Sequence, residues 1–540
     1  MKEIWNVAVG LELFLVIAVI VPLLIFGYLY LFDRQQSEHS VLRNFPLLGK
    51  VRYFLEKIGP ELRQYLFLND NEGMPFSRRE YESVVKRGKY LSDKIGYGSV
   101  RDFEEEGWYI ANAMLPLQEQ EQRMDNRSPV TTERYQIQQE GLFSRKEKRE
   151  EKKQNPYLLA DSDVVVLGEN CREPWRLKGL IGMSAMSYGA LGDHALTALS
   201  LGLGKAGGTW MNTGEGGLTP YHLKGNTEII MQIGPGLFGV RDHLGRFDWD
   251  ELKRKAQLPQ VRAFELKMGQ GAKIRGGHVD GKKVSPEIAS IRQVKPWETI
   301  DSPNRFSEFH DVPSMLDFLS KIRDYTGKPT GIKIVVGGWG PVAELAHEMK
   351  KTGRGPDFIT VDGSEGGTGA SFQDLADGVG LPNKSALMIT DTVLREYGVR
   401  DQVKLIASGK LVTSDRIAVA LGMGADLVNI ARGFMISVGC IQALRCHTNQ
   451  CPVGVATTDP KLQRALVVEE KKFRVTNYIL ALRKGLFRIA ASAGLESPVQ
   501  FDRCHVVYKD GRGAVYSLED VLRSFIPSDI RPGEESVSIS

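Results

Sequence analysis

The sequence predicts an α/β protein whose largest part is a (β/α)8 TIM barrel, and three observations lead to this fold class. The chain of 540 residues is 42% apolar and 25% charged, which suits a large core and excludes a mostly disordered protein. Ten of its 57 glycines lie in residues 1–160, so the remaining 47 follow that point. Short apolar runs alternate there with segments of helix length, as in α/β proteins.

The apolar runs have the length and composition of buried strands, and there are eight of them. Eight strands alternating with helices predict a barrel whose active site lies at the carboxyl ends of the strands, although a doubly wound sheet fits the same alternation. The long interval between 268 and 331 is expected to be an inserted active-site loop. The runs are LIGMSAM (180–186), TWMNT (209–213), EIIMQIG (228–234), FELKM (264–268), GIKIVVG (331–337), FITVDG (358–363), KLIASG (404–409) and LVNIARG (427–433).

An N-terminal transmembrane helix is predicted over residues 5–32. Leu13 to Phe32 is a run of 20 residues without a charge, which spans about 30 Å as a helix, the thickness of a bilayer core. Aromatic residues gather at its ends, as in an interfacial belt. A cleaved signal peptide is the alternative, but LYLFDRQQ, at the end of the run, offers no small-residue cleavage site.

Basic residues predict the orientation of this helix. Only Lys2 precedes the span, whereas Arg34, Arg43, Lys50 and Arg52 follow it closely. The positive-inside rule then predicts a single-pass, membrane-anchored protein, in contact with lipid through this helix, whose catalytic domain is cytoplasmic.

Changes in composition divide the rest of the chain. Residues 35–157 are expected to form a small helical region and linker. Within them, the charged run 145–153 is expected to be a solvated helix or linker, because both signs alternate. Residues 158–510 are expected to form the barrel domain, and 511–540 a C-terminal extension.

The net charge, the number of cysteines and one glycine motif exclude several function classes. A net charge of +4 gives no reason to expect a nucleic-acid partner. Five cysteines are too few for a disulfide framework at this length, so reduced thiols or metal ligation are expected. GLGKAG (202–207) follows a helical stretch instead of a strand, so its match to the dinucleotide-binding pattern is interpreted as accidental.

Three cysteines predict a metal centre. Cys440, Cys446 and Cys451 have the spacing C-x5-C-x4-C, and a proline follows the last. Thiolates ligate iron–sulfur clusters, and a proline after a cluster cysteine is familiar from ferredoxins. A zinc site completed by His447 and a set of inert buried cysteines are the alternatives.

Strand ends supply further candidate site residues. The loops after the last two predicted strands, with Gly409 and Lys410 in one, suit a phosphate group, although simple turns would look similar. The glycine-rich segments TGEGG (213–217), which contains Glu215, and DGSEGGTGAS (362–371) are expected to be site loops.

A basic turn follows the fourth predicted strand. KMGQGAKIRGG (267–277) carries Lys267, Gln270, Lys273 and Arg275. Several cations and an amide at one strand end suit an anionic substrate whose carboxylates they would orient; a solvated basic turn is the alternative.

From about residue 160 to 500, the chain closely resembles the FMN-binding synthase domain of glutamate synthases. The resemblance implies a (β/α)8 barrel that carries FMN and a [3Fe–4S] cluster, with Cys440, Cys446 and Cys451 as the cluster ligands. The segments that carry it are SAMSYGALGDHAL (184–196), NTGEGG (212–217), KMGQGAK (267–273), DGSEGGTGAS (362–371), ASGKLVTSDRIAVALGMGAD (407–426) and CHTNQCPVGVAT (446–457).

The resemblance also implies an activity. Ammonia would condense with 2-oxoglutarate, and hydride from FMN would reduce the resulting 2-iminoglutarate to L-glutamate, with electrons supplied through the cluster. The implied roles are catalysis for Glu215 and Lys333; substrate binding for Lys267, Gln270, Lys273 and Arg292; and FMN binding for Ser184, Ala185, Ser187, Lys333, Gly366, Gly367, Gly409, Lys410, Arg432 and Gly433.

Departures from the family's pattern leave the amine and the electron donor open. The chain begins with MKEIW and has no cysteine before Cys171, so we expect no glutamine amidotransferase domain. Free ammonia, a separate amidotransferase subunit or another amine would supply nitrogen, and an N-methylglutamate synthase-like activity is an alternative. Ferredoxin, a reductase subunit or a membrane carrier would supply electrons. A membrane-tethered FMN and iron–sulfur electron-transfer subunit without amination is the alternative from another class.

Overall fold

The computed structural model describes residues 2–271, 273, 276–369 and 371–527, without the side chains of 2–4 and 6–13. The chain divides into two compact units, Met1–Arg79 and Glu80–Ser540. The barrel and the candidate site lie in the second unit.

The first unit is helical. Its turn after the first helix is held by Asp33, a buried carboxylate that accepts the Leu47 backbone N–H at 3.0 Å and pairs with Lys50 at 2.6 Å. The elements are α1 (Lys2–Gln35), α2 (Ser40–Asn44), α3 (Leu48–Leu62) and a π-helical turn (Arg63–Phe67).

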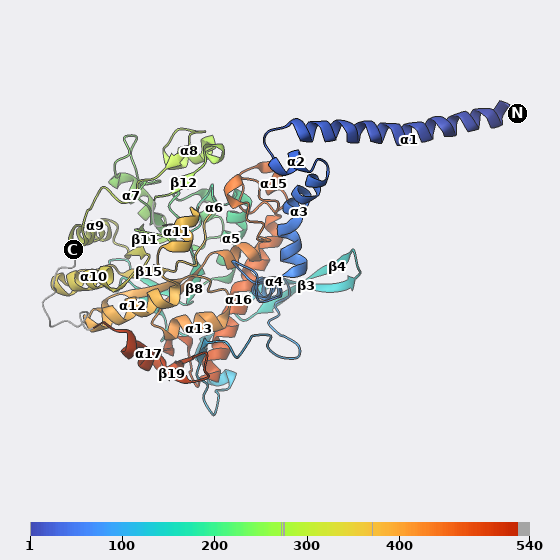
Figure 1. Cartoon of the computed structure of the whole chain (residues 1–540). Helices are drawn as coiled ribbons and strands as arrows, with labels where there is room; N and C mark the ends of the chain where they lie inside the picture. Colours follow the sequence, from blue (N-terminus) through green and yellow to red (C-terminus); the bar gives the residue numbers. More distant parts are fainter. Residues whose placement is uncertain (1, 272, 274–275, 370, 528–540) are drawn as a thin grey trace. The chain divides into compact units, whose positions relative to one another are not determined.

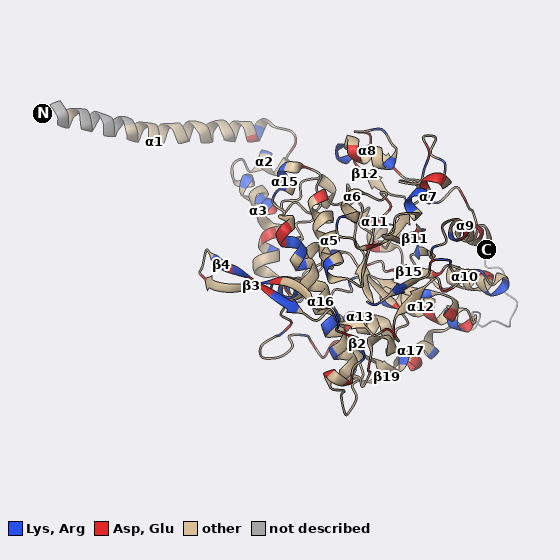
Figure 2. Ribbon diagram, turned by 180° about the vertical axis from the view of Figure 1, so that it is seen from behind, with Lys and Arg blue, Asp and Glu red and all other residues tan. Residues whose placement is uncertain are grey.

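Helix α1 contains the predicted membrane span. Its segment Phe14–Gln35 is long and apolar enough to cross a bilayer, a test that a signal sequence also passes. The large apolar side chains from Phe14 to Phe32 lie exposed, unlike those of a core helix. Figure 2 shows no charge along the described side chains of α1 until its end.

Eight parallel strands close into a barrel, which confirms the predicted fold class (Figure 1). All eight predicted runs form its strands, and the pairing of Met183 with Met211 joins the first two. The strands are β8 (Ile181–Met183), β9 (Trp210–Asn212), β10 (Glu228–Ile233), β11 (Val261–Lys267), β14 (Thr330–Ile334), β15 (Phe358–Asp362), β16 (Lys404–Ser408) and β17 (Leu427–Ile430).

Helices connect the strands, and local signals fix their ends. In α9, the Asp311 side chain accepts the Ser314 N–H, and Gly327 ends the helix in the left-handed conformation. GLGKAG (202–207) lies at the end of α5, not at a strand-to-helix turn. The helices are α5 (Asp193–Ala206), α6 (Pro220–Leu223), α7 (Trp249–Ala256), α9 (Val312–Thr326), α10 (Trp339–Thr352), α11 (Gln373–Gly378), α12 (Asn383–Glu396), α13 (Ser414–Gly422), α14 (Arg432–Ser437), α15 (Pro460–Gln463) and α16 (Val468–Ser492).

The interval between β11 and β14 forms a structured insertion at the carboxyl end of β11. It contains the two-stranded antiparallel pair β12 (His278–Val279) and β13 (Ile300–Asp301). Between these strands lie a 3-10 turn (Gly281–Lys283) and α8 (Pro286–Arg292). The insertion therefore covers the barrel end where active sites lie.

The expectation of a helical region and linker over 35–157 is wrong for its second half. After α4 (Arg78–Tyr90), the chain forms β1 (Gly107–Ile110), β2 (Met124–Asp125) and a long hairpin of β3 (Val130–Glu140) and β4 (Arg145–Gln154).

The charged run 145–153 forms most of strand β4. Its alternating signs suit a strand because they meet opposite charges on β3, as in the pair Arg149–Glu133 at 3.0 Å. Glu147 accepts from Lys89 and Tyr90 of α4 at 2.7 and 2.5 Å. Both signs are visible on the hairpin in Figure 2.

The remaining strands lie outside the barrel. β18 pairs with β1 and β19, so residues from the expected C-terminal extension join a sheet that begins before the barrel. Residues 528–540 of that extension lie outside the described residues. The elements are β5 (Leu158–Leu159), β6 (Val165–Leu167), β7 (Trp175–Leu177), β18 (Val506–Lys509), β19 (Val515–Ser517) and α17 (Leu518–Phe525).

Arg483 of α16 ties three separate segments of the barrel unit together. Its guanidinium is buried and donates to the backbone carbonyls of Pro156, Ala206, Gly207 and Gly208. Burial lowers the pKa of Arg483 to about 9. Helix α16, the end of α5 and the segment before β5 therefore share one buried donor.

We expect Arg483→Met to destabilise the protein by about 3 kcal/mol, because each buried acceptor left without a donor costs about 1–3 kcal/mol. The measurement is thermal denaturation of the purified full chain. Arg488→Met is the matched control, since Arg488 lies on the same helix with an exposed side chain. Equal melting temperatures for the two variants would contradict the role of Arg483.

Candidate active site

A pocket of about 360 Å³ opens at the carboxyl ends of the barrel strands. It is bounded by the loops after β8, β9 and β15, by the insertion and by the cysteine segment. Its lining includes Ser187, Glu215, Phe238, Lys273, His278, Lys283, Arg292, Ser302, Thr368, Gly369 and His447. The glycine-rich loops, the insertion and the cysteine segment, which are far apart in the sequence, therefore line the same pocket.

Glu215 and Lys267 form an ion pair in this site. Glu215 Oε1 lies 2.6 Å from Lys267 Nζ, and the Glu215 side chain is 16% exposed. Burial raises the pKa of this carboxyl, but Lys267, Lys273 and Arg292 more than offset burial and hold the pKa below its ordinary value. The Glu215 carboxylate is therefore ionised and surrounded by cations.

Arg292 reaches the pocket from the end of α8. Its Nη2 donates to the Tyr188 carbonyl at 3.0 Å, and its guanidinium carbon lies 5.3 Å from the centre of the Phe238 ring. Burial lowers the pKa of Arg292 to about 10, and the charge of Glu215 opposes that shift. Helix α8 is held in turn by Glu287, which accepts from two tyrosine hydroxyls.

Three buried polar atoms at this pocket have no hydrogen-bond partner among the residues that the structure describes: Glu215 Oε2, Arg292 Nε and Ser302 Oγ. Buried polar atoms are normally paired in native proteins. Unpaired acceptors and donors beside one cavity fit a polar ligand that completes them. The positions of Lys267, Lys273 and Arg292 suit an anionic ligand in particular.

The other two residues of the basic turn are placed differently. The Gln270 carbonyl accepts the Lys273 N–H at 2.8 Å, so this turn is closed by its own backbone. Gln270 does not line the pocket, and Arg275 lies outside the described residues.

Lys333 lies inside the barrel mouth with its own counter-ion. Its Nζ is 3.1 Å from Oδ2 of Asp362, an oxygen that also accepts the Gly271 N–H at 3.0 Å. Burial lowers the pKa of Lys333, but the charges of Asp362 and Glu265 more than offset burial and raise the pKa above its ordinary value. Lys333 therefore remains a buried cation.

Four cations gather beside the carboxyl ends of β15, β16 and β17: Lys384, Lys410, Arg416 and Arg432. Burial lowers the pKa of Lys384 and of Lys410, and neighbouring arginines lower both further. Glu80 pairs with Arg416 on one side of this group. A fold that holds cations against their mutual repulsion suits a phosphate group, which relieves it.

The glycine-rich loop after β15 lies against Arg432. Arg432 donates to the Glu365 carbonyl, and a Cβ at Gly367 would lie 3.0 Å from Arg432 Nη1. The Gly366 N–H donates to the Gly363 carbonyl at 3.0 Å. This loop therefore brings backbone close to the four-cation group.

The turn after β16 requires two residues with positive φ angles. Gly409 has a φ of +149° and Lys410 a φ of +47°. A Cβ at Gly409 would lie 2.8 Å from the Asn383 Cβ. Gly433 has another reason to be glycine, because a Cβ there would lie 2.5 Å from the Tyr478 hydroxyl behind it.

The residues after β8 follow the barrel rim. The Ser184 N–H donates to the Ile430 carbonyl at 2.9 Å, which continues the strand pairing. Ala185 comes next, half-buried, and Ser187 lines the pocket.

The three predicted metal ligands lie next to the pocket. Cys451 is buried, and Cys440 and Cys446 are half-buried. Burial raises the pKa of the Cys440 thiol to about 11, and the charges of Cys446 and Cys451 add to the shift. A Cβ at Gly369 would lie 3.6 Å from the Cys446 Cβ, so the glycine-rich loop contacts this segment.

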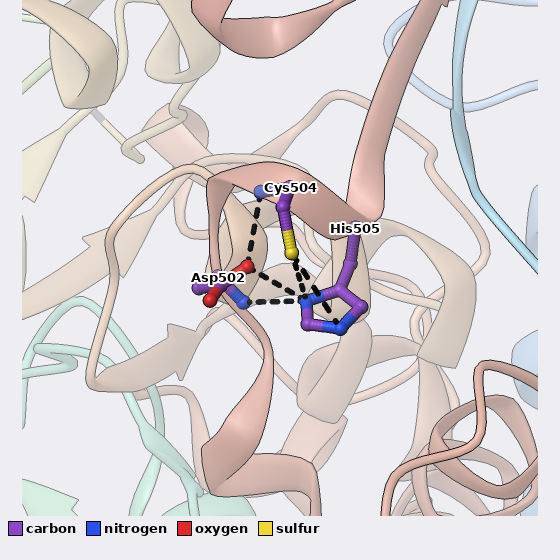
Figure 3. A group of neighbouring side chains, drawn as sticks. All are labelled: Asp502, Cys504 and His505. Carbon is purple, nitrogen blue, oxygen red and sulfur yellow. Dashed lines mark hydrogen bonds and ion pairs between the residues drawn. The ribbon is translucent and has the colours of Figure 1, made fainter.

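Another group of potential metal ligands has a structural explanation. The donor atoms of Asp502, Cys504 and His505 lie within 4.8 Å of one another (Figure 3). Asp502 accepts the Cys504 N–H at 2.9 Å and lies 2.8 Å from His505 Nδ1. These contacts cap the 3-10 turn Arg503–His505, whose Arg503 binds the buried Asp391 of α12. These contacts therefore hold the turn against α12.

Sequence reasoning missed several residues of the site. Asp362 ends a predicted strand, so its position was a usable signal. Lys384 and Glu265 lie inside a helix and a strand without a motif around them, and Arg416 lies within the segment 407–426, which the resemblance covers without giving this residue a role. Lys283 and Ser302 belong to the insertion, where no strand pattern predicts which side chain points inward.

Comparisons with known proteins identify the family of this chain. The model of the conserved region in glutamate synthase matches residues 116–496. The chain is 57% identical over 522 residues to the glutamate synthase large subunit-like protein YerD of Bacillus subtilis, which covers 96% of this chain and 99% of that protein.

More distant relatives match a smaller share of the chain. The archaeal glutamate synthase (NADPH) of Methanocaldococcus jannaschii is 32% identical over 320 residues, 59% of this chain and 59% of that protein. The glutamate synthase (NADPH) large chain of Bacillus subtilis is 32% identical over 325 residues, 58% of this chain and 20% of that protein. The chain therefore belongs to the glutamate synthase family of oxidoreductases, which act on CH–NH2 donors.

Proposed function

We propose that this protein is an iron–sulfur flavoenzyme that reductively aminates 2-oxoglutarate to L-glutamate, with ammonia or a partner-supplied amine. One observation carries the proposal: an ionised, partly unpaired Glu215 stands among three cations in a pocket bounded by the three-cysteine segment. A dicarboxylate substrate and an amine nitrogen complement these charges.

The cations would bind the carboxylates of 2-oxoglutarate. Lys273 and Arg292 line the pocket, and both are buried. Charge-assisted hydrogen bonds from such groups hold a carboxylate in orientation. The buried Ser302 hydroxyl offers one more hydrogen bond at the same wall.

Glu215 would hold the reacting nitrogen. Lys267 occupies its Oε1, whereas Oε2 has no partner among the described side chains and backbone and would accept N–H groups of the substrate. Ammonia adds to the keto carbon, water leaves, and the resulting iminium carries a positive charge that the Glu215 carboxylate stabilises. Reduction of 2-iminoglutarate at that carbon, with one proton taken up at nitrogen where needed, yields L-glutamate.

The described residues fit FMN. Lys384, Lys410, Arg416 and Arg432 would hold its phosphate, beside the glycines of the two adjoining loops. When bound, FMN supplies a hydride to the substrate. The buried ammonium of Lys333 is available at the barrel mouth to stabilise negative charge there.

The cysteine spacing fits an iron–sulfur cluster better than zinc. Thiolates on one tetrahedral zinc ion lie about 3.8 Å apart, since each Zn–S bond is about 2.3 Å. Among the described residues, the group of three donor residues whose ligand atoms all lie within 4.8 Å of one another is Asp502, Cys504 and His505, so the sulfurs of Cys440, Cys446 and Cys451 do not all lie that close together. An inorganic core between the ligands accounts for such spacing, and a [3Fe–4S] cluster matches their number.

The same pocket admits two variants of this function. A larger amine, such as methylamine, in place of ammonia would give an N-methylated glutamate by the same steps. An electron-transfer subunit without amination would have no use for a carboxylate surrounded by cations, so the pocket favours an enzyme. Ferredoxin or a reductase subunit would supply electrons, and a separate amidotransferase subunit would be a source of ammonia.

A combined spectroscopic and activity test addresses the proposal. Full-length protein purified in detergent without oxygen would show flavin absorption and the EPR signal of an oxidised three-iron cluster. With 2-oxoglutarate, reduced ferredoxin and either ammonia or methylamine, chromatography identifies the product. Flavin and cluster without any aminated product would overturn the enzyme function and leave electron transfer.

We also propose that α1 anchors the protein in the cytoplasmic membrane with the barrel on the cytoplasmic side. We expect the chain to stay in the membrane pellet after an alkaline wash, because Phe14–Gln35 is apolar and long enough to span. Mass spectrometry of the intact protein is the control and should find residues 1–35 still attached. Release into the supernatant, or a mass that lacks this segment, would contradict the anchor.

Glu215→Gln should lower kcat/KM for ammonia about 100-fold, because it removes the negative charge that stabilises the iminium. The measurement is the rate of glutamate formation with saturating 2-oxoglutarate. Glu344→Gln is the matched control, since Glu344 is an exposed carboxylate on α10, away from the pocket lining. Unchanged kinetics in Glu215→Gln, with flavin content equal to wild type, would sink this role.

Cys446→Ser should abolish the three-iron EPR signal while flavin absorption remains, because the thiolate ligand is lost. Cys504→Ser is the matched control and should retain the signal, since Cys504 belongs to the capped turn on α12. A three-iron signal of wild-type intensity in Cys446→Ser would refute the ligand assignment.

A further inference from the structure

One short segment of the insertion touches both the substrate pocket and the cysteine segment. The 3-10 turn Gly281–Lys283 is followed, after two residues, by α8 (Pro286–Arg292). Arg292 at one end faces Glu215, whereas Lys283 at the other end lines the same pocket and reaches the cysteines. The two sites are therefore joined by about ten residues of ordered backbone.

Lys283 contacts the segment that carries the cysteines. Its Nζ donates to the backbone carbonyl of Cys446 at 2.6 Å, and its side chain is buried. Burial lowers the pKa of Lys283, and the negative charges of Cys446, Asp280 and Cys451 oppose that shift. Burying an ammonium group is costly, so a buried lysine normally has interactions that compensate for the lost hydration.

The backbone around Lys283 is held from several directions. The Asp280 side chain accepts the Lys282 N–H at 2.9 Å, and the Gly281 N–H donates to Thr299 Oγ1 at 3.1 Å. The next residue, Val284, is fully buried and accepts the Trp297 N–H at 2.8 Å. The lysine is thus presented by an ordered turn.

We propose that Lys283 is a positioning residue that fixes Cys446 and holds a positive charge beside the three-cysteine site, and so raises the reduction potential of the cluster bound there. The proposal rests on the proposed function, because it requires the cluster. Reduction adds negative charge, which a nearby cation stabilises, and burial keeps solvent and salt from screening the interaction. Net charge around a cluster is one of the factors that set its potential.

Variants at Lys283 and at its neighbour Lys282 separate the effect of the charge from that of the hydrogen bond. Lys282 is exposed, so Lys282→Met removes one positive charge that solvent already screens. Lys283→Arg keeps the charge, whereas Lys283→Met removes it together with the hydrogen bond to Cys446. Lys283→Gln removes the charge but keeps an N–H donor for the Cys446 carbonyl.

The test is an EPR-monitored redox titration of the three-iron signal in the full-length protein. At the wild-type midpoint potential, we expect the ratio of reduced to oxidised cluster to fall about tenfold in Lys283→Met, which corresponds to 59 mV for a one-electron couple. Lys283→Arg should restore most of the shift, and Lys282→Met should titrate as wild type. A merely structural lysine would leave the midpoint unchanged.

Three results would decide against the inference or the function beneath it. An unchanged midpoint in Lys283→Met overturns the inference while the wild-type cluster signal keeps the proposed function intact. If Lys283→Met does not assemble the cluster, Lys283→Gln is titrated instead, and a wild-type midpoint there also overturns it. A wild-type protein without a three-iron signal removes the proposed cluster itself.

Discussion

The barrel mouth depends on one buried carboxylate, Glu265 of β11. It accepts hydrogen bonds from Asn212 of β9 at 2.8 Å, Gln232 of β10 at 2.6 Å and Thr360 of β15 at 2.5 Å. The charge of Glu265 also supports the ammonium of Lys333 on β14. An ion inside a barrel is tolerated only when it is fully satisfied, so this network requires five strands to keep their register. The residues of the candidate site follow the ends of these strands, so the network around Glu265 fixes their positions.

Charge is distributed in the site according to the groups it would hold. Lys384, Lys410, Arg416 and Arg432 gather where a phosphate fits, and a separate group of cations surrounds Glu215 where a dicarboxylate fits. In each group a carboxylate, Glu80 in the first and Glu215 in the second, offsets part of the repulsion between the cations. Each group would become more stable on binding the proposed anion, so ligand binding would be coupled to local stability.

The insertion after β11 connects these parts. It supplies Arg292 and Ser302 to the pocket wall and Lys283 to the Cys446 carbonyl. In a barrel, the loops at the carboxyl end of the strands carry the chemistry, and this long one forms a small folded layer of two strands and a helix. The pocket and the cysteine segment therefore both contact this insertion.

The eight barrel strands, the three-cysteine motif and the apolar N-terminal helix could be predicted from the sequence by itself, because each is a local pattern of apolar, cysteine or uncharged residues. The tertiary structure decided what local patterns do not contain. The charged run 145–153 became a strand because β3 and α4 supply its partners. Lys384 and Arg416, which are 32 residues apart in the chain, belong to the same four-cation group. Lys283 contacts Cys446, which is 163 residues away. Such pairings arise from barrel closure, which brings distant strand ends together, so no sequence window predicts them.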